Sequence, residues 1–334
     1  MPERPQRNLA MELVRATEAA AMVAARHRDL GEREAANPVA AAAMRLVLQT
    51  IEMDGVIVVG EGEKGVAPLL YHGEIIGSGR PPAVDVAVDP IEGTPARALG
   101  RPNTLSLVAL AERWSMWAPG PCVYVEEIVV GRAARDAIDL RLGLTDNLLR
   151  IAAALNCRVK DLTVFVLDKP RHEPLIREIR AAGARVKLNS GGFIVGAILA
   201  AMPGTGVDVM ISVGRASEAV LAAAAVKALG GALHIRRAPQ SEEERARVQA
   251  ALGPNVSEIL TEDDLIKSED VFFGATGITD GSLLRGIQFG REAATTESVV
   301  MRARSGTLRY VRAIHQLDKL MRISQIDYTG EGRP

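Results

Sequence analysis

Residues 89–94, with the sequence Asp-Pro-Ile-Glu-Gly-Thr, combine two carboxylates and a hydroxyl at the end of a predicted strand. Residues 83–88 before them are rich in valine and predict a strand that runs into a proline turn. Carboxylate oxygens at the open end of a strand suit a hard divalent cation such as Mg²⁺. Thr94 beside that cation could position a water for attack. The alternative is an ordinary turn in which Asp89 hydrogen-bonds its own backbone and Glu92 is solvated.

A second acidic stretch follows an earlier predicted strand. Residues 56–59 lead into the Gly-Glu-Gly-Glu of residues 60–63, where the glycines let the backbone approach a ligand closely. Glu61 at the end of this strand could share a metal ion with Asp89. Taken alone, the same residues also fit a surface turn, so both interpretations stay open.

A basic segment in the second half suits a phosphate group. Lys169, Pro170 and Arg171 follow a predicted strand at residues 163–167, and ligands of open α/β sheets collect at the carboxyl ends of strands. Two cations held by a rigid proline can bind a phosphate monoester. The alternative is a basic helix start, although helix N-termini favour acids. We expect the neighbouring His172 to be structural.

Two helix starts in the second half carry weaker signals. Ser190, Gly191 and Gly192 precede a predicted helix, and free backbone amides at a helix N-terminus form an anion site. The same three residues also make a plain helix cap. Glu218 lies in the first turn of a later helix, where an acid commonly complements the helix dipole, so its spacing alone does not single it out.

The elements that must position these residues differ between the two parts of the chain. The sequence of the first part predicts Ala-rich helices and the strands of one mainly antiparallel sheet. Asn37 is expected to cap the second of these helices. In the second part, short apolar strands alternate with helices, which is typical of a doubly wound α/β unit. We therefore predict an α/β (α+β) chain with two parts, residues 1–158 and 159–334, that share an interface. A C-terminal strand near residues 299–304 could return to the first part.

The expected elements can be given as residue ranges. In the first part they are helices at residues 8–27, 38–53 and 147–155 and strands at residues 56–59, 71–76, 83–88, 104–109 and 123–130. In the second part they are strands at residues 163–167, 184–188, 207–213, 232–235, 271–275 and 299–304 and helices at residues 174–182, 193–201 and 217–229. A charged helix from Ser241 is expected to expose all its acids, and the tail from Asp327 to be loose.

Composition narrows the class of protein. The 334 residues are 48% hydrophobic and 24% charged, a globular balance. A formal net charge of −1 and 3% aromatic residues favour neither nucleic acid nor membrane as a partner. Cys122 and Cys157 are the only cysteines, which suits a reduced, cytoplasmic protein without a zinc cluster or a disulfide framework. Charged residues interrupt the N-terminus and every apolar run, so we expect neither a signal peptide nor a membrane helix.

Taken in order along the chain, these motifs resemble the class II (GlpX-type) fructose-1,6-bisphosphatases of the Mg²⁺-dependent, lithium-sensitive sugar-phosphatase superfamily. The resemblance extends from about residue 8 to about residue 315. The matching segments are residues 59–63, 67–71, 85–94, 169–172, 275–279 and 294–297. The resemblance implies a layered αβαβα fold. It also implies a Mg²⁺ or Mn²⁺ enzyme of gluconeogenesis that hydrolyses the 1-phosphate of fructose 1,6-bisphosphate to fructose 6-phosphate and phosphate.

The resemblance also assigns roles to individual residues. The implied metal ligands are Glu61, Asp89, Glu92 and Glu218, with Asn37 at a further ligand position. Thr94 and Glu61 are implied to be catalytic, and the distal phosphate is implied to bind Tyr124, Lys169 and Arg171. The whole implied substrate-binding set is Glu92, Gly93, Thr94, Tyr124, Lys169, Pro170, Arg171, Ser190, Gly191, Gly192 and Arg215. The resemblance further implies a homodimer or higher homo-oligomer.

This sequence departs from the family pattern around the implied site. Asn37 stands where relatives have an aspartate ligand, Ser190 and Gly192 stand where the family has aspartates, and Arg215 stands where it has glycine. The site therefore loses three acids and gains one cation, before Glu34 is counted. We expect one metal site to be weakened or lost and the substrate to be altered. Arg215 could replace a missing cation, grip an extra phosphate or block the pocket.

Three hypotheses about function follow. The first is an active phosphatase on fructose 1,6-bisphosphate, with sedoheptulose 1,7-bisphosphate as a further substrate. The second is a catalytically impaired paralogue that binds a sugar phosphate as a regulator or partner subunit. The third is a phosphatase of another phosphorylated polyol. The acids that match the family pattern favour an active enzyme. The residues that depart from the pattern favour a lost activity or a different substrate.

Overall fold

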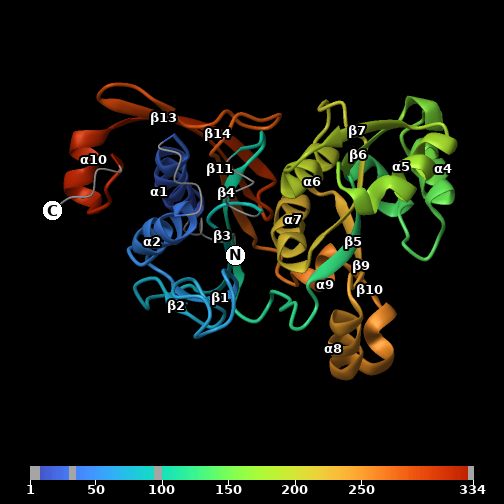
Figure 1. Ribbon diagram of the computed structural model, residues 1–334, viewed down its shortest axis with the longest axis horizontal. Coiled ribbons are helices and arrows are strands. Elements are labelled where there is room, and N and C mark those ends of the chain that lie inside the picture. Colours follow the sequence, from blue (N-terminus) through green and yellow to red (C-terminus); the bar gives the residue numbers. More distant parts are fainter. Residues whose placement is uncertain (1–7, 30–34, 94–99, 330–334) are drawn as a thin grey trace, which may run out of the picture.

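The computed structural model describes residues 8–29, 35–93 and 100–329. Two β-sheets alternate with three helical layers across the molecule, in the order αβαβα (Figure 1). Each layer presents apolar side chains to its neighbours, and the buried residues form three clusters that lie between successive layers. The predicted α/β (α+β) class and the layered arrangement are confirmed.

The first sheet runs in the order β12-β13-β11-β4-β3-β1-β2, with β14 beside β13. Among its described strands, β1 and β3 pair in parallel and the other pairs are antiparallel, as predicted. The strand expected near residues 299–304 does return to this sheet, as the hairpin of β13 and β14. The bounds are β1 (Asp54–Val59), β2 (Ile75–Ile76), β3 (Ala83–Asp89), β4 (Leu105–Glu112), β11 (Phe272–Gly277), β12 (Gln288–Phe289), β13 (Ala293–Arg302) and β14 (Thr307–Gln316).

The second sheet runs in the order β10-β9-β5-β8-β6-β7. Strand β6 pairs in parallel with β7 and β8, and the other described pairs are antiparallel. The bounds are β5 (Tyr124–Val130), β6 (Thr163–Leu167), β7 (Arg185–Asn189), β8 (Val209–Arg215), β9 (Ala232–Arg237) and β10 (Ile259–Thr261).

The assignment of residues 123–130 to the first sheet is wrong. Strand β5 lies in the second sheet, between β8 and β9. Its alternating side chains are buried on both faces, Val125 and Val129 in one cluster and Ile128 and Val130 in another, and such a pattern does not encode the neighbouring strand. The chain crosses between the sheets after Glu112. A division into two folding units at residues 158 and 159 stays a prediction.

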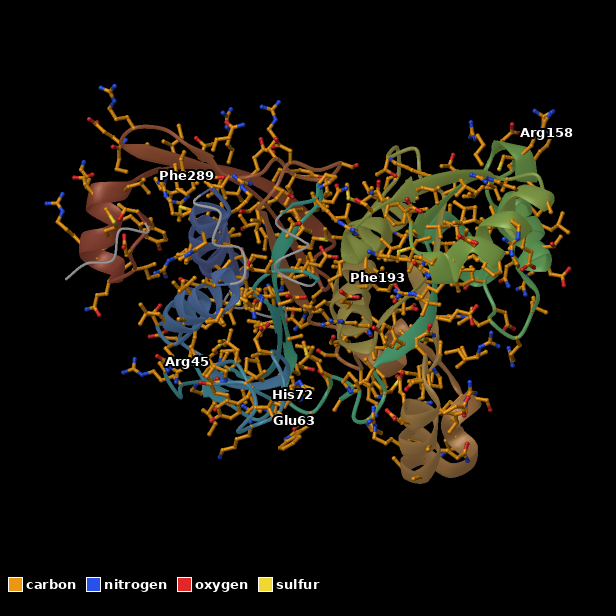
Figure 2. All side chains as sticks on the ribbon, in the orientation of Figure 1. Arg45, Glu63, His72, Arg158, Phe193 and Phe289 are labelled. Atoms are coloured by element: carbon orange, nitrogen blue, oxygen red, sulfur yellow. The ribbon has the colours of Figure 1, made fainter. Side chains whose placement is uncertain are left out.

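Helices α6 (Phe193–Ala201) and α7 (Ala216–Leu229) form the central layer, where Figure 2 labels Phe193. Helix α7 contacts β3, β4 and β11 on one side and β5, β8 and β9 on the other. Helix α6 is apolar around its whole circumference, and α7 is apolar except near its ends, where Ser217, Glu218 and Lys227 lie; this is expected of helices buried on all sides. A Cβ at Gly196 would lie 2.3 Å from the Phe165 ring, so this glycine lets α6 approach β6 closely.

The outer layers cover the remaining sheet faces. Helices α1 (Ala10–Asp29) and α2 (Ala36–Leu48) pack on the first sheet, and α4 (Leu144–Ala154) and α5 (Glu173–Ala181) on the second (Figure 1). The described part of the chain has no helix that is both long and apolar enough to span a membrane. The other described helices are η1 (Arg132–Ala137), η2 (Val159–Asp161), η3 (Pro170–His172), α8 (Glu242–Leu252), η4 (Gly253–Ser257), α9 (Glu262–Leu265) and α10 (Leu317–Ser324).

Several local predictions are wrong, and two of them fail because of tertiary contacts. Helix α2 begins at Ala36, so Asn37 lies inside its first turn and does not cap it. The strand expected at residues 71–76 shortens to β2. Glu244 on α8 is buried, because its Oε1 accepts the backbone N–H groups of Val123 and Tyr124 at 2.8 and 3.0 Å. Tyr328 in the tail is buried too, and its carbonyl accepts a hydrogen bond from Arg26 Nε at 3.0 Å.

Candidate active site

Two adjoining cavities lie where the N-terminal ends of α6 and α7 approach the carboxyl end of β3. The first, here called the basic cavity, has a volume of about 240 Å³, and the second, the acidic cavity, about 270 Å³. Gly93 and Arg215 line both of them. The other residues of the basic cavity are Glu92, Arg101, Thr104, Tyr124, Leu167, Lys169, Arg171, Ser190, Gly191, Gly192, Phe193 and Glu218. Those of the acidic cavity are Asn37, Gly60, Glu61, Val88, Asp89, Ile91, Ser217 and Leu221.

The two cavities bring together nearly every residue that the sequence nominated. Pro170 is the exception among the described residues, because it begins η3 between Lys169 and Arg171 and lines neither cavity. Thr94 lies outside the described residues, as does Glu34. The roles of the nominated residues as ligands or catalysts stay predictions.

Glu61 and Asp89 occupy the acidic cavity because their strands are neighbours. Strands β1 and β3 are parallel, so their carboxyl ends lie at the same edge of the sheet. Burial raises the pKa of Asp89 well above its usual range, the nearby charges of Glu61 and Glu218 raise it further, and Arg215 opposes them. Burial likewise raises the pKa of Glu61. Two acids are thus held close together in a weakly solvated place.

Asn37 contacts Glu61 from the first turn of α2. Its amide Nδ2 donates a hydrogen bond to Glu61 Oε2 at 2.5 Å. In this arrangement Asn37 binds an acid, whereas the aspartate implied at this position would have added another negative charge. Glu63, two residues after Glu61, is exposed, and its Oε1 lies 3.0 Å from His72 Nδ1. Figure 2 labels both residues. Only the first acid of the Gly-Glu-Gly-Glu stretch therefore belongs to the site.

Glu92 is a buried carboxylate fixed at the start of α6. Its Oε1 accepts the backbone N–H of Ile194 at 2.8 Å, and its Oε2 is buried without a hydrogen-bond partner among the described residues. Burial raises the pKa of Glu92 well above its usual range, and the charge of Glu218 raises it further. An unpartnered buried carboxylate oxygen is costly, and a cation beside it would remove that cost.

Glu218 lies in the first turn of α7, at the edge of the basic cavity. Its Oε2 accepts the backbone N–H of Arg215 at 3.0 Å. Burial raises the pKa of Glu218, while that hydrogen bond and the charges of Arg215, Arg171 and Lys169 act in the opposite direction. Glu218 therefore lies among the cations of the basic cavity.

These four carboxylates have the donor chemistry of a site for a hard divalent cation. They offer only oxygen, are largely buried and mutually repulsive, and a bound divalent cation would relieve that repulsion. No three His, Cys, Asp or Glu side chains in the described ranges converge as a ready metal-ligand set. The acids instead divide between the cavities, and the orphaned Oε2 of Glu92 is the observation that best fits a cation.

The wall of the basic cavity beside α6 is held by two cations. Lys169 Nζ donates to the carbonyl of Ser190 at 3.1 Å, and Arg101 NH1 donates to the same carbonyl at 2.6 Å. Gly192 has φ +80°, and a Cβ there would lie 2.8 Å from Asn103 Cβ. An aspartate at residue 192 would be strained in this backbone conformation. The loop as it folds here therefore favours a glycine, which has no carboxylate, at this position.

An arginine and a tyrosine also line the basic cavity. The Arg171 guanidinium lies 5.4 Å from the centroid of the Tyr124 ring and donates from NH2 to the carbonyl of Val213 at 2.7 Å. His172 is bound within the fold, as expected of a structural residue. Its Nδ1 lies 2.7 Å from the carbonyl of Leu167, its Nε2 accepts the N–H of Val213, and burial lowers its pKa.

The basic cavity has more cations than acids. Arg101, Lys169, Arg171 and Arg215 face Glu92 and Glu218, which favours a phosphate dianion. Sequence reasoning missed Arg101, because it lies in a loop with no motif or strand pattern and reaches the site through a residue 89 positions away.

Comparison with known proteins identifies the family. The family model described as bacterial fructose-1,6-bisphosphatase, glpX-encoded, matches residues 7–315. The chain belongs to this family. A class 2 fructose-1,6-bisphosphatase of Haemophilus influenzae is 42% identical over 332 residues, which cover 96% of this chain and 99% of the relative. The fructose-1,6-bisphosphatase 1 class 2 of Escherichia coli K12 is 40% identical over 327 residues, which cover 94% of this chain and 97% of the relative. The resemblance found from the motifs is confirmed, and the family is one of metal-dependent phosphatases.

Proposed function

We propose that this protein hydrolyses the 1-phosphate of fructose 1,6-bisphosphate to fructose 6-phosphate and phosphate, as a cytoplasmic enzyme of gluconeogenesis. The observation that carries the proposal is that the acidic and basic cavities meet at Gly93 and Arg215. A phosphate held among the cations of one cavity would lie beside the carboxylates of the other. The names of the relatives, which are fructose-1,6-bisphosphatases, support this substrate.

The acids of both cavities would hold the metal, Mg²⁺ or Mn²⁺. Asp89, Glu61 and Glu218 supply carboxylates, and Glu92 supplies its unpartnered Oε2. When bound, the cation supplies Lewis-acid activation of water and neutralises charge on the phosphoryl oxygens. Thr94, next to Gly93, is proposed to orient the attacking water.

The basic cavity would hold the rest of the substrate. Lys169 and Arg171 are proposed to bind the distal 6-phosphate, because both approach the cavity from the segment after β6. Tyr124 supports the plane of Arg171. With the 6-phosphate fixed there, the 1-phosphate would be directed toward the junction with the acidic cavity.

The sugar-facing loop also permits a larger substrate. A Cβ at Gly191 would meet nothing closer than 3.9 Å, and residues 190–192 carry no charge. Hydroxyl groups would therefore bind backbone amides rather than carboxylates. This open wall supports sedoheptulose 1,7-bisphosphate as a second candidate substrate.

A phosphate-release assay tests the function. The wild type is compared on fructose 1,6-bisphosphate, sedoheptulose 1,7-bisphosphate and a phosphorylated polyol, with Mg²⁺, with Mn²⁺ and with EDTA. We expect metal-dependent release from fructose 1,6-bisphosphate, and a loss of at least about a hundredfold in Asp89→Asn, which removes a carboxylate charge from the metal site. Binding of the sugar bisphosphates without turnover on any of them would support a sugar-phosphate-binding protein instead.

The chain is further proposed to work as a homodimer or higher homo-oligomer. The support is the resemblance to the family, and no contact in the single described chain bears on it. Sedimentation of the purified protein at several concentrations measures the assembly, and a mass equal to the 35.6 kDa of one chain at all of them would contradict it.

A further inference from the structure

Arg215 occupies the junction of the two cavities. It is the last residue of β8, pairs across the sheet with Tyr124 of β5, and anchors its backbone N–H on Glu218 at 3.0 Å. Its side chain is exposed and lines both cavities. Among the described residues it has no carboxylate within ion-pair distance. The guanidinium is thus placed over the site by the backbone without being tied to a single acid.

The charge of Arg215 acts on the acids of both cavities. It lowers the pKa of Glu61, of Asp89 and of Glu218, against the effect of burial. A positive group that stabilises several carboxylates at once has the electrostatic effect of a bound cation.

Asn37 removes the charge that a further metal ion would require. The resemblance implies an aspartate here, but the amide donates a hydrogen bond to Glu61 Oε2. That bond engages one oxygen of Glu61, and the neutral amide adds no charge. The charged and amide side chains of the acidic cavity are therefore two carboxylates, one amide donor and one guanidinium. The other two proposed ligands, Glu92 and Glu218, lie in the basic cavity, where four cations offset their charge. This balance of charge suits one divalent cation better than several.

We propose that Arg215 takes the place of one divalent cation: it binds the reacting phosphoryl group where the cavities meet, and the protein holds a single divalent cation per chain. This rests on the proposed binding of a phosphate ester. The guanidinium is planar, always charged and matched to two phosphate oxygens. It cannot activate water as a metal does. The remaining cation would activate the water, and Arg215 would supply charge and orientation.

Metal stoichiometry tests whether the protein holds a single divalent cation per chain. Equilibrium dialysis with Mn²⁺ is applied to the wild type, to Arg215→Lys and to the double variant Asn37→Asp/Arg215→Gly. We expect one Mn²⁺ per chain in the wild type and in Arg215→Lys, and two in the double variant, which regains an acid and loses a cation. Arg291→Gly, which removes an exposed arginine outside both cavities, serves as control and should bind one. Two or more Mn²⁺ in the wild type, or one in the double variant, would overturn the proposal.

Phosphate affinity tests whether Arg215 binds the phosphoryl group. Inorganic phosphate is titrated calorimetrically into each protein at saturating Mg²⁺. We expect Arg215→Gly to bind phosphate at least about tenfold more weakly, Arg215→Lys to recover part of the affinity, and Arg291→Gly to match the wild type. Equal affinity in Arg215→Gly and the wild type would overturn the role of Arg215. Because Arg215 is exposed and engages Glu218 through its backbone, the glycine variant should fold, and the lysine variant carries the test if it does not.

Turnover separates this inference from the proposed function. A wild type that releases phosphate from fructose 1,6-bisphosphate while Arg215→Gly does so with unchanged kcat and KM would refute only the inference. A wild type that shows the expected Mn²⁺ count and Arg215-dependent phosphate binding but no turnover would refute only the proposed function.

Discussion

Glu127 is a buried acid outside both cavities. It lies opposite Ser212 across the β5–β8 pair, and both of its carboxylate oxygens and the Ser212 hydroxyl lack hydrogen-bond partners within the described ranges. Burial, and then the charge of Glu218, raises the pKa of Glu127 well above its usual range. A carboxyl with a raised folded-state pKa contributes stability below its unfolded pKa of about 4.3, and that contribution is lost as the pH rises through the folded value.

Glu127→Met should therefore stabilise the protein increasingly as the pH rises. The substitution keeps the volume and removes the unpaired polar group, so we expect a gain of about 1–3 kcal/mol at neutral pH and little at pH 4. Denaturant unfolding from pH 4 to pH 8 measures it. The matched control is Glu126→Met, which removes a half-buried acid bonded to Arg236 at 2.6 Å and should yield no gain. A gain in unfolding free energy that did not change with pH would contradict a raised pKa for Glu127.

At the level of elements, α8 holds the start of β5 in place. Glu244 Oε1 accepts the N–H groups of Val123 and Tyr124, and its Oε2 accepts that of Gln240 at 2.9 Å. This one side chain therefore connects a peripheral helix to the strand that carries Tyr124 into the basic cavity.

Glu244→Ala should destabilise the protein by about 1–3 kcal/mol, because three backbone N–H groups lose a buried carboxylate acceptor. Glu243→Ala on the same helix removes an exposed acid and should change stability by less than about 0.5 kcal/mol. Thermal unfolding measures both. KM should also rise in Glu244→Ala because Tyr124 is displaced. Equal effects of the two substitutions would show that α8 does not support β5.

At the scale of the whole molecule, the site joins two sheets and the helical layer between them. Asp89 ends β3 and Glu61 follows β1 in the first sheet, and Glu218 lies in the first turn of a central helix. Lys169 and Arg171 follow a strand of the second sheet. A cation or phosphate bound there connects elements that are far apart in the sequence. Its binding free energy should therefore appear in the unfolding of the whole chain.

Removal of the metal by EDTA should lower the unfolding temperature. A cation at about 100 times its Kd stabilises the native state by about 2.7 kcal/mol. The effect should be larger at pH 8 than at pH 6, because the raised pKa values of Asp89, Glu92 and Glu218 leave the site less ionised at the lower pH. Calorimetry with and without EDTA measures it. Asp89→Asn should respond weakly, and an equal response would place the metal elsewhere.

The local elements were predictable where a single segment carries enough information. Helix α6 and strand β6 have the predicted bounds, Phe193–Ala201 and Thr163–Leu167, since each is a mainly apolar run, the helix between Gly192 and Pro203 and the strand ending before Asp168. The sheet that contains β5 was not predictable, because alternation shows which faces are buried and not which strand is the neighbour. For the same reason, Glu244 was expected on a solvated face: its acceptor role depends on a strand 120 residues away.

The sequence by itself determined the chemistry available: acids after two strands of one half, cations after a strand of the other, and membership of a phosphatase family. Residue types in order along the chain suffice for that, since they state which groups are present. Only the tertiary structure decided how these groups meet. It directed the Asn37 amide to Glu61, left Glu92 Oε2 without a described partner and placed Arg215 between the cavities. Hydrogen bonds and charge interactions act over a few ångströms, so they depend on distances between segments that the sequence does not state.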